Sequence, residues 1–240
     1  MWFGAKVRGS ALCRVLFSAL MLAAVTLLLA TGAGAKKATP AGLIKVALTS
    51  LHPTQGAVGM REAGAKRAEV EERASDPKRL DKFLAKHAIP VVLGPNGQMY
   101  LIDHHHLGLA LFQAQVAEVY VSIEDDLSGL TIAEFWKRME AEGKVHAFDA
   151  AGRKIDPSAL PRNLGDLNDD PYRDLAGSVR DAGGFDKTKA PFSEFSWADF
   201  FRARVAAGLI ASDYDAAVRQ GMVLAHGAEA AALPGFNGRR

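Results

Sequence analysis

An acid followed by three histidines, residues 103–106, is the stretch of this sequence whose residue types best suit chemistry. An apolar, β-rich segment, 99–102, precedes it, and residues 107–115 have a helical pattern. The first turn of a helix offers free backbone N–H groups and the positive end of the helix dipole, so such a junction can bind a phosphate. Histidines at this point can donate hydrogen bonds to phosphate oxygens or move protons near neutral pH.

The three consecutive histidines cannot all share one site unless the turn into the helix rotates them, because neighbouring side chains of a strand point to opposite faces. We expect Asp103, His105 and His106 to face the pocket as catalytic residues, and we place His104 among the ligand-binding residues. Asp103 and Glu62 are the candidate general bases for an attacking water or hydroxyl. Two other roles stay open: Asp103 can cap the following helix, and one histidine of the three is expected to be structural.

The elements around this stretch predict an α+β fold. The turn at 95–97, Pro-Asn-Gly, joins strands at 91–93 and 99–102 as a hairpin. The fold expected is a small mixed β-sheet within 43–125 and a mostly helical C-terminal part. Further expected elements are strands at 43–48 and 119–123, a helix over 60–73, and helices capped by Asp76, Thr131, Ser196 and the 212–215 run.

The N-terminus has the pattern of a secretory signal peptide. Lys6, Arg8 and Arg14 precede an apolar run over 15–30 that ends in a small-residue motif, Ala-Gly-Ala, at 33–35. The run is short for a spanning helix, which needs about 20 apolar residues. We therefore expect cleavage after residue 35 and a periplasmic or secreted protein without membrane contact; an uncleaved anchor is the alternative.

Removal of residues 1–35 changes what the composition indicates. The 29 basic residues fall by three to 26 against 27 acidic residues, so the net charge of +2 becomes about −1. A near-neutral chain has no global attraction to long nucleic acid. The single cysteine, Cys13, leaves with the signal peptide, which excludes disulfides, thiolate catalysis and cysteine-based metal sites. The expected parts are then a domain over 36–128, a helical extension over 129–225 and a flexible tail over 226–240.

The segment 98–111, a strand followed by Asp-His-His-His and a helix, resembles the phosphate-binding box of the ParB/sulfiredoxin superfamily. The run Pro-Thr-Gln at 53–55, followed by Val-Gly at 58–59 and an acidic residue at 62, resembles the first box of its ParB-like nuclease branch. The resemblance covers residues 46–205, with further similar runs at 170–173, 179–184 and 191–195. It implies a ParB/sulfiredoxin-like domain that hydrolyses or transfers a phosphoester on a nucleotide or nucleic acid.

The same resemblance places Thr54 and Gln55 at the ligand, although Gln55 can equally stabilise a turn. The arginine that commonly follows the histidines in this superfamily is Leu107 here. Arg173 and Arg180, about two helical turns apart, are the candidates for the missing cation, with ion pairs to neighbouring acids as their alternative role.

Two other classes of function stay open from the sequence. One is a non-catalytic binding module that holds a small anionic ligand in the same pocket. The other is a metal-binding protein, in which a divalent ion needs a distant ligand such as His52, His87 or Asp170, because adjacent histidines rarely bind one ion alone. The cofactor is thus open between a divalent metal ion and a nucleotide, and the expected partner is a small phosphorylated ligand or nucleotide.

Overall fold

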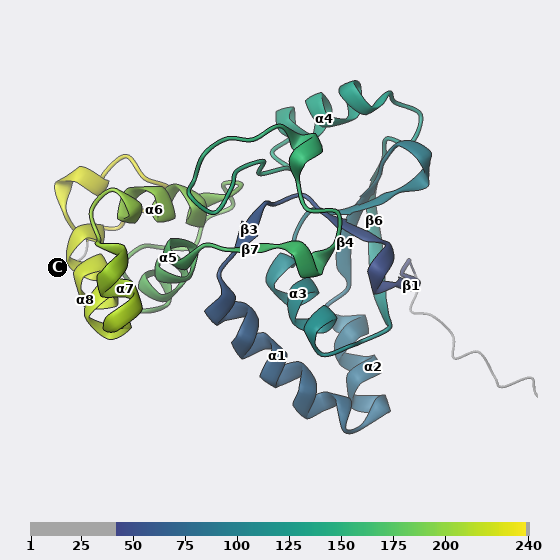
Figure 1. Ribbon diagram of the computed structural model, residues 1–240, viewed down its shortest axis with the longest axis horizontal. Helices are drawn as coiled ribbons and strands as arrows, with labels where there is room; N and C mark the ends of the chain where they lie inside the picture. Colours follow the sequence, from purple (N-terminus) through teal and green to yellow (C-terminus); the bar gives the residue numbers. More distant parts are fainter. Residues whose placement is uncertain (1–41, 239–240) are drawn as a thin grey trace, which may run out of the picture. The chain divides into compact units, whose positions relative to one another are not determined.

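The computed structural model describes residues 42–238, so the predicted signal peptide lies outside the described residues. Five strands form a mixed sheet in the order β1-β6-β4-β5-β2, and β3 and β7 form a second, two-stranded sheet (Figure 1). The predicted α+β class is confirmed. The strands are β1 (Ile44–Ala47), β2 (Leu51–Pro53), β3 (Ala57–Val58), β4 (Ile89–Leu93), β5 (Met99–Leu101), β6 (Glu118–Asp126) and β7 (Asn168–Asp169). The helices are α1 (Met60–Ala74), α2 (Pro77–Lys86), α3 (His105–Gln113), α4 (Ile132–Ala141), α5 (Pro171–Asp181), α6 (Ser193–Arg202), α7 (Ala207–Ser212) and α8 (Tyr214–Ala225).

The sheet brings the two sequence boxes to one edge. The predicted hairpin is confirmed: β4 and β5 pair antiparallel, with Val91 opposite Leu101. Asn96 turns the chain between them with a φ of 61°, a left-handed conformation that asparagine adopts more readily than most residues. On the other side of β5, β2 runs parallel to it with Pro53 opposite Leu101, so the two strands end side by side. The segments that follow these ends carry the candidate site residues.

Helices cover both faces of this sheet, with α1 and α3 on one face and α4 on the other (Figure 1). The alternation of strand side chains explains the arrangement: Val91 belongs to a core shared with α1 and α3, whereas its neighbour Val92 packs with Phe135 and Met139 of α4. All four side chains are fully buried. The strong apolar character of residues 89–93 therefore reflects a strand that is covered on both sides.

The C-terminal helices α5, α6 and α8 pack around Trp197, which is fully buried and stacks on Phe185 with the ring centroids 4.1 Å apart. In the segment that the sequence predicts to be a flexible tail, Ala230, Leu233 and Phe236 belong to this core. The indole N–H of Trp197 donates to the Pro234 carbonyl at 2.7 Å, and Phe236 packs against the same cluster. Because this segment is rich in glycine and alanine, its sequence does not predict that it packs against the core.

The helix starts confirm most of the predicted caps. The Asp76 carboxylate accepts from the N–H groups of the first turn of α2, and Thr131 forms a capping box with Glu134. The predicted cap at Ser196 is wrong, because α6 begins three residues earlier at Ser193. The earlier start places Phe195, which is buried, in the first turn of α6.

The start of α1 is fixed against α5 by a buried carboxylate. Asp174 accepts from the backbone N–H groups of Arg61 and Glu62 at 2.8 and 2.9 Å. Gly59 precedes this turn, and a Cβ there would lie 2.1 Å from the Asp174 Oδ1 atom. Only glycine therefore allows this close approach of the two helices.

Gly59→Ala is expected to lower the free energy of unfolding by about 2–3 kcal/mol, since the added methyl group forces the α1–α5 junction apart. Urea denaturation measures this change. The matched control is Gly64→Ala inside α1, where no atom lies within 4 Å of the added Cβ. This control should stabilise by about 0.5–1 kcal/mol, because alanine favours a helix. Equal effects at both positions would contradict the role of Gly59.

Candidate functional site

A cleft of about 670 Å³ opens where α1, α3 and α5 meet the segment 187–195. It lies at the sheet edge where β2 and β5 end, and it contains the start of α3. Its charged and polar lining residues are Gln55, Glu62, Lys66, Glu69, His87, Asp103, His104, His105, His106, Arg173, Arg180, Lys187, Thr188, Lys189, Ser193 and Glu194.

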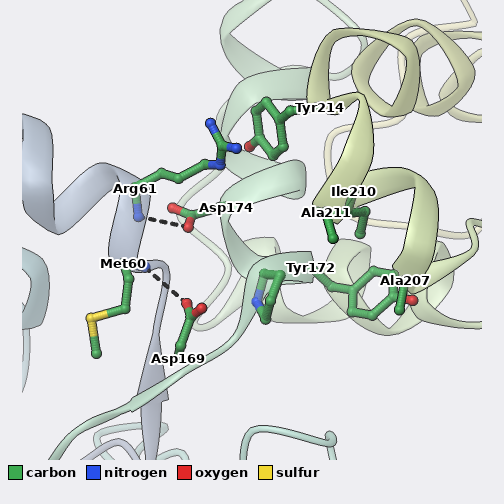
Figure 2. Close-up of a pocket in the computed structure, with 10 residues that line it drawn as sticks. Met60, Arg61, Asp169, Tyr172, Asp174, Ala207, Ile210, Ala211 and Tyr214 are labelled. Atoms are coloured by element: carbon green, nitrogen blue, oxygen red, sulfur yellow. Dashed lines mark hydrogen bonds between the residues drawn. The ribbon is translucent and has the colours of Figure 1, made fainter.

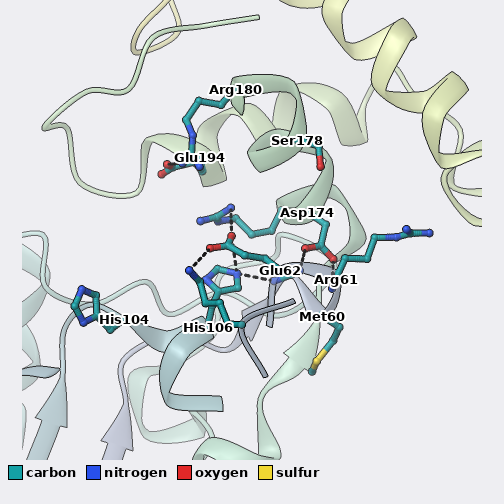
Figure 3. A network of polar contacts seen from close by, with 12 residues as sticks. Met60, Arg61, Glu62, His104, His106, Asp174, Ser178, Arg180 and Glu194 are labelled. Atoms are coloured by element: carbon teal, nitrogen blue, oxygen red, sulfur yellow. Dashed lines mark hydrogen bonds and ion pairs between the residues drawn. The ribbon is translucent and has the colours of Figure 1, made fainter. Parts of the chain in front are cut away.

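Glu62, in the first turn of α1, is the carboxylate at the centre of the polar network (Figure 3). One of its oxygens lies 3.5 Å from the His106 Nε2 atom and 3.7 Å from the Arg173 Nη1 atom, and the other lies 3.6 Å from the Lys66 ammonium. Each contact is too long for a strong hydrogen bond. The charges of Lys66 and Arg173 thus hold the carboxylate in place, while its lone pairs remain available to a ligand or water.

His106, also in this network, has a neutral ring whose orientation is fixed by a hydrogen bond. Its Nε2 atom accepts a hydrogen bond from the Gly59 N–H at 3.1 Å, which leaves the ring proton on Nδ1. Burial, followed by the nearby Arg173 guanidinium, holds its pKa well below 6.5. His106 therefore tethers the start of α1 to α3, and it is a poor proton acceptor at neutral pH.

His105 makes the same kind of tether one residue earlier. Its Nε2 atom accepts from the Thr54 N–H at 3.1 Å, and the ring is 2% exposed. Burial lowers its pKa from 6.5 to about 3. The Thr54 hydroxyl, also buried, donates to the Leu101 carbonyl at 2.8 Å. These contacts make His105 and Thr54 part of the support beneath the cleft, since they fix the loop after β2 against β5 and α3.

Arg173 supplies a buried cation with unused hydrogen-bonding capacity. The residue is 8% exposed, and its Nε and Nη1 atoms are buried without a hydrogen-bond partner among the described residues. Its guanidinium also lies over the Phe195 ring, 5.5 Å from the centroid. A buried donor without an acceptor is costly, so an anionic ligand that accepts from these nitrogens would stabilise the site.

Arg180 is already neutralised by acids. It donates to Glu194 and to Asp181, the latter at 2.9 Å from Nη2. Burial alone would raise the pKa of Glu194, but the Arg173 and Arg180 guanidiniums outweigh burial and hold that pKa below its usual value. Arg180 consequently fixes the segment 187–195 at the cleft, and Arg173 is the better anion ligand of the two arginines.

The remaining predicted residues lie at the rim. Asp103 is exposed, and its carboxylate accepts from the His104 N–H at 2.6 Å, so it braces the turn into α3. His104 precedes α3 in a left-handed conformation with a φ of 64° and lines the cleft, as does Gln55. Four further residues line the cleft that local sequence signals do not predict as site residues: Lys66, Lys187, Lys189 and Glu194. Their spacing in the sequence fits an exposed helix or loop, so only the fold shows that they lie at the cleft.

A metal site does not form from the predicted ligands. Within residues 42–238, no group of three or more histidine and acidic side chains is placed to hold an ion. The distant candidates are engaged elsewhere: His52 Nδ1 contacts the Arg162 carbonyl at 2.9 Å, and Asp170 accepts from Arg202 at 2.7 Å. His87 lies against the Phe83 ring. The described residues therefore contain no such three-ligand cluster for a resident metal ion.

Two histidines whose pKa values are lowered by burial predict a pH dependence of stability: His105 and His146, whose ring stacks on Phe195 with the centroids 4.0 Å apart. Burial lowers the pKa of His105 to about 3 and that of His146 to about 4, so the folded chain binds fewer protons than the unfolded chain below pH 6.5. The stability they contribute is complete above pH 6.5 and is lost as the pH falls. Each ring should remove about 1.4 kcal/mol per pH unit in that window. Urea denaturation at pH 7.5, 6 and 5 measures the slope, which should be shallower in His105→Gln; an unchanged slope would contradict this.

Comparison with known proteins agrees with this fold. The family model described as "Putative ParB-like nuclease" matches residues 44–203, which include both sequence boxes, α5 and most of the cleft. The chain belongs to this family. The predicted resemblance to the ParB-like nuclease branch is thus confirmed, with nearly the predicted extent.

A solved structure is also similar to this ParB-like chain. It is the crystal structure of protein Atu1540 from Agrobacterium tumefaciens, with 42% sequence identity and a TM-score of 0.75. The similarity covers 82% of this chain and 99% of that chain, so the helical part after α4 is included. No curated protein matches the chain.

Proposed function

We propose that this ParB-like protein binds a phosphate group in the cleft and hydrolyses or transfers a phosphoester there, with a nucleotide or nucleic acid as the substrate class that the family implies. The observation that carries the proposal is the buried Arg173 guanidinium, whose Nε and Nη1 atoms make no hydrogen bond to the described residues. It lies in the same cleft as the first turn of α3, which offers free backbone N–H groups to an anion.

The charge balance of the cleft favours a ligand that carries a small negative charge. Five cations line it, namely Lys66, Arg173, Arg180, Lys187 and Lys189, against four carboxylates, Glu62, Glu69, Asp103 and Glu194. One net positive charge remains with the histidines neutral. This suits a single phosphate better than a long polyanion, which needs many unpaired cations.

Glu62 is the group proposed to activate the attacking oxygen. Its carboxylate makes only contacts of 3.5 Å or longer, so a water or hydroxyl can donate to it. The water oxygen attacks phosphorus, its proton passes to Glu62, the ester P–O bond breaks, and the leaving oxygen collects a proton from solvent. Arg173 stabilises the charge that develops on the phosphoryl oxygens, and His106 keeps the start of α1 in place.

A second candidate function is binding without turnover. His105 and His106 both use Nε2 to accept a backbone N–H, and burial lowers both pKa values, so neither ring supplies a general acid at neutral pH. The same cleft would then hold a small anion as a periplasmic binding module.

The experiment that separates the two functions measures binding and turnover on one preparation. Thermal shift with inorganic phosphate reports binding, because a ligand of the folded state raises its apparent stability. Release of nitrophenol from 4-nitrophenyl phosphate and bis(4-nitrophenyl) phosphate reports hydrolysis. A shift with turnover supports the enzyme, and a shift without turnover of these or nucleotide substrates supports the binding module. No shift at millimolar phosphate would overturn both.

Export is the other half of the proposal, and it is supported by the basic, apolar and small-residue pattern of residues 1–35. Among residues 42–238, no helix is long and apolar enough to cross a membrane. Expression of the full chain in a Gram-negative host, followed by fractionation and N-terminal sequencing, should give a soluble periplasmic protein that begins at Lys36. Retention of Met1 in the cytoplasmic fraction would contradict export.

A further inference from the structure

A second cavity, of about 260 Å³, lies beside the junction of α1 with α5 and is separate from the cleft in its lining (Figure 2). We call it the back pocket. Adjacent residues of each helix line different cavities: Arg61 lines the back pocket and Glu62 the cleft, just as Tyr172 and Arg173 do in α5. Its lining residues are Met60, Arg61, Asp169, Pro171, Tyr172, Asp174, Ala207, Ile210, Ala211 and Tyr214.

We propose that the back pocket binds a small organic cation, an ammonium group on a compact apolar body. The proposal does not depend on phosphate chemistry in the cleft. One wall is apolar and is formed by small and aliphatic side chains of α7, namely Ala207, Ile210 and Ala211. This wall suits a hydrocarbon body of the size of a cyclohexyl ring.

The charged lining of the back pocket favours a cation. Asp169 and Asp174 carry two negative charges and Arg61 carries one positive charge, so one negative charge remains. Asp169 is exposed and accepts the Met60 N–H through Oδ1 at 3.1 Å, which leaves its second oxygen for a ligand (Figure 2). Asp174 already accepts two backbone N–H groups of α1, so it would act on a ligand only through its negative electrostatic potential.

The aromatic lining favours a cation as well. The Arg61 guanidinium lies 3.9 Å from the centroid of the Tyr214 ring, and Arg202 lies 5.0 Å from that of Tyr172. Both rings therefore already attract positive charge through their faces. Arg61 is exposed, so its side chain can move aside and give the Tyr214 face to a ligand.

The test compares three probes of similar shape and different charge: cyclohexylmethylammonium, cyclohexylmethanol and cyclohexanecarboxylate. Dissociation constants come from ¹H–¹⁵N NMR titration of the purified protein, with resonances of α7 as reporters. The ammonium probe should bind at least about fivefold more tightly than the alcohol, and the carboxylate should bind more weakly than both. Equal affinity of the ammonium and the alcohol, or no binding of either, would overturn the proposal.

Four variants test whether the ammonium probe binds in the back pocket. Asp169→Asn should weaken the ammonium probe about threefold, whereas its control Asp126→Asn, another exposed carboxylate that accepts one backbone N–H, should change nothing. Arg61→Gln removes the competing cation and should strengthen binding, a gain that misfolding cannot mimic. Ala211→Leu, at an exposed position, should fill the pocket and abolish binding. Retained affinity in Ala211→Leu, or weaker binding in Arg61→Gln, would place the probe elsewhere and overturn the assignment.

Discussion

Arg173→Gln is expected to lower the affinity for inorganic phosphate by about 10- to 100-fold, the effect of losing a charged hydrogen-bond donor in a buried site. The guanidinium is 8% exposed and forms an ion pair with Glu62 at 3.7 Å, but Nε and Nη1 have no hydrogen-bond partner among the described residues, so a ligand can complete its hydrogen bonds. Isothermal titration measures the dissociation constant. The folded state should persist, because glutamine also removes buried donors that have no hydrogen-bond partner among the described residues.

Two further arginine variants distinguish geometry from charge. Arg173→Lys keeps the positive charge and loses the planar fork, so its affinity should fall between those of the native protein and Arg173→Gln. Arg153→Gln removes a cation that is 79% exposed and pairs with Asp149, away from the cleft, and should bind phosphate normally. If Arg153→Gln and Arg173→Gln lost affinity equally, phosphate would bind by general surface charge and the assignment to Arg173 would fail.

Glu62→Gln is expected to reduce phosphoester turnover by about 10²- to 10⁴-fold, the usual contribution of a general base. Glutamine keeps the size of the side chain and cannot accept a proton. Phosphate affinity should stay the same or rise, because a negative charge leaves the neighbourhood of Arg173. The ratio of kcat to KM for the native and variant proteins, together with titration of phosphate, separates the two effects.

The matched control is Glu69→Gln, which removes a second carboxylate from the same helix and the same cleft. Glu69 pairs with Arg73 at 3.0 Å and has none of the contacts that Glu62 makes to His106 and Arg173. Its turnover should remain within about twofold of native, as expected for an exposed pair. If Glu62→Gln kept native turnover, Glu62 would not be the general base.

The sequence by itself determined the family and most of the local elements, with the start of α6 as an exception. Strong local signals carried this information: the Pro-Asn-Gly turn, the Asp76 and Thr131 caps, and the alternation around Val119 and Val121 each depend on neighbours within a few residues. The two boxes, around Thr54 and around the histidines, gave the family for the same reason, since each is a contiguous pattern.

Only the tertiary structure decided what each side chain does. A run of three histidines in the sequence indicates a catalytic site. In the structure, β2 pairs parallel with β5, and the segments after these strands meet so that His105 and His106 accept the backbone N–H groups of Thr54 and Gly59. The cation and the carboxylate that we propose to face the ligand, Arg173 and Glu62, are over 100 residues apart in the sequence. They meet because Asp174 binds the start of α1, a long-range contact that no local pattern encodes.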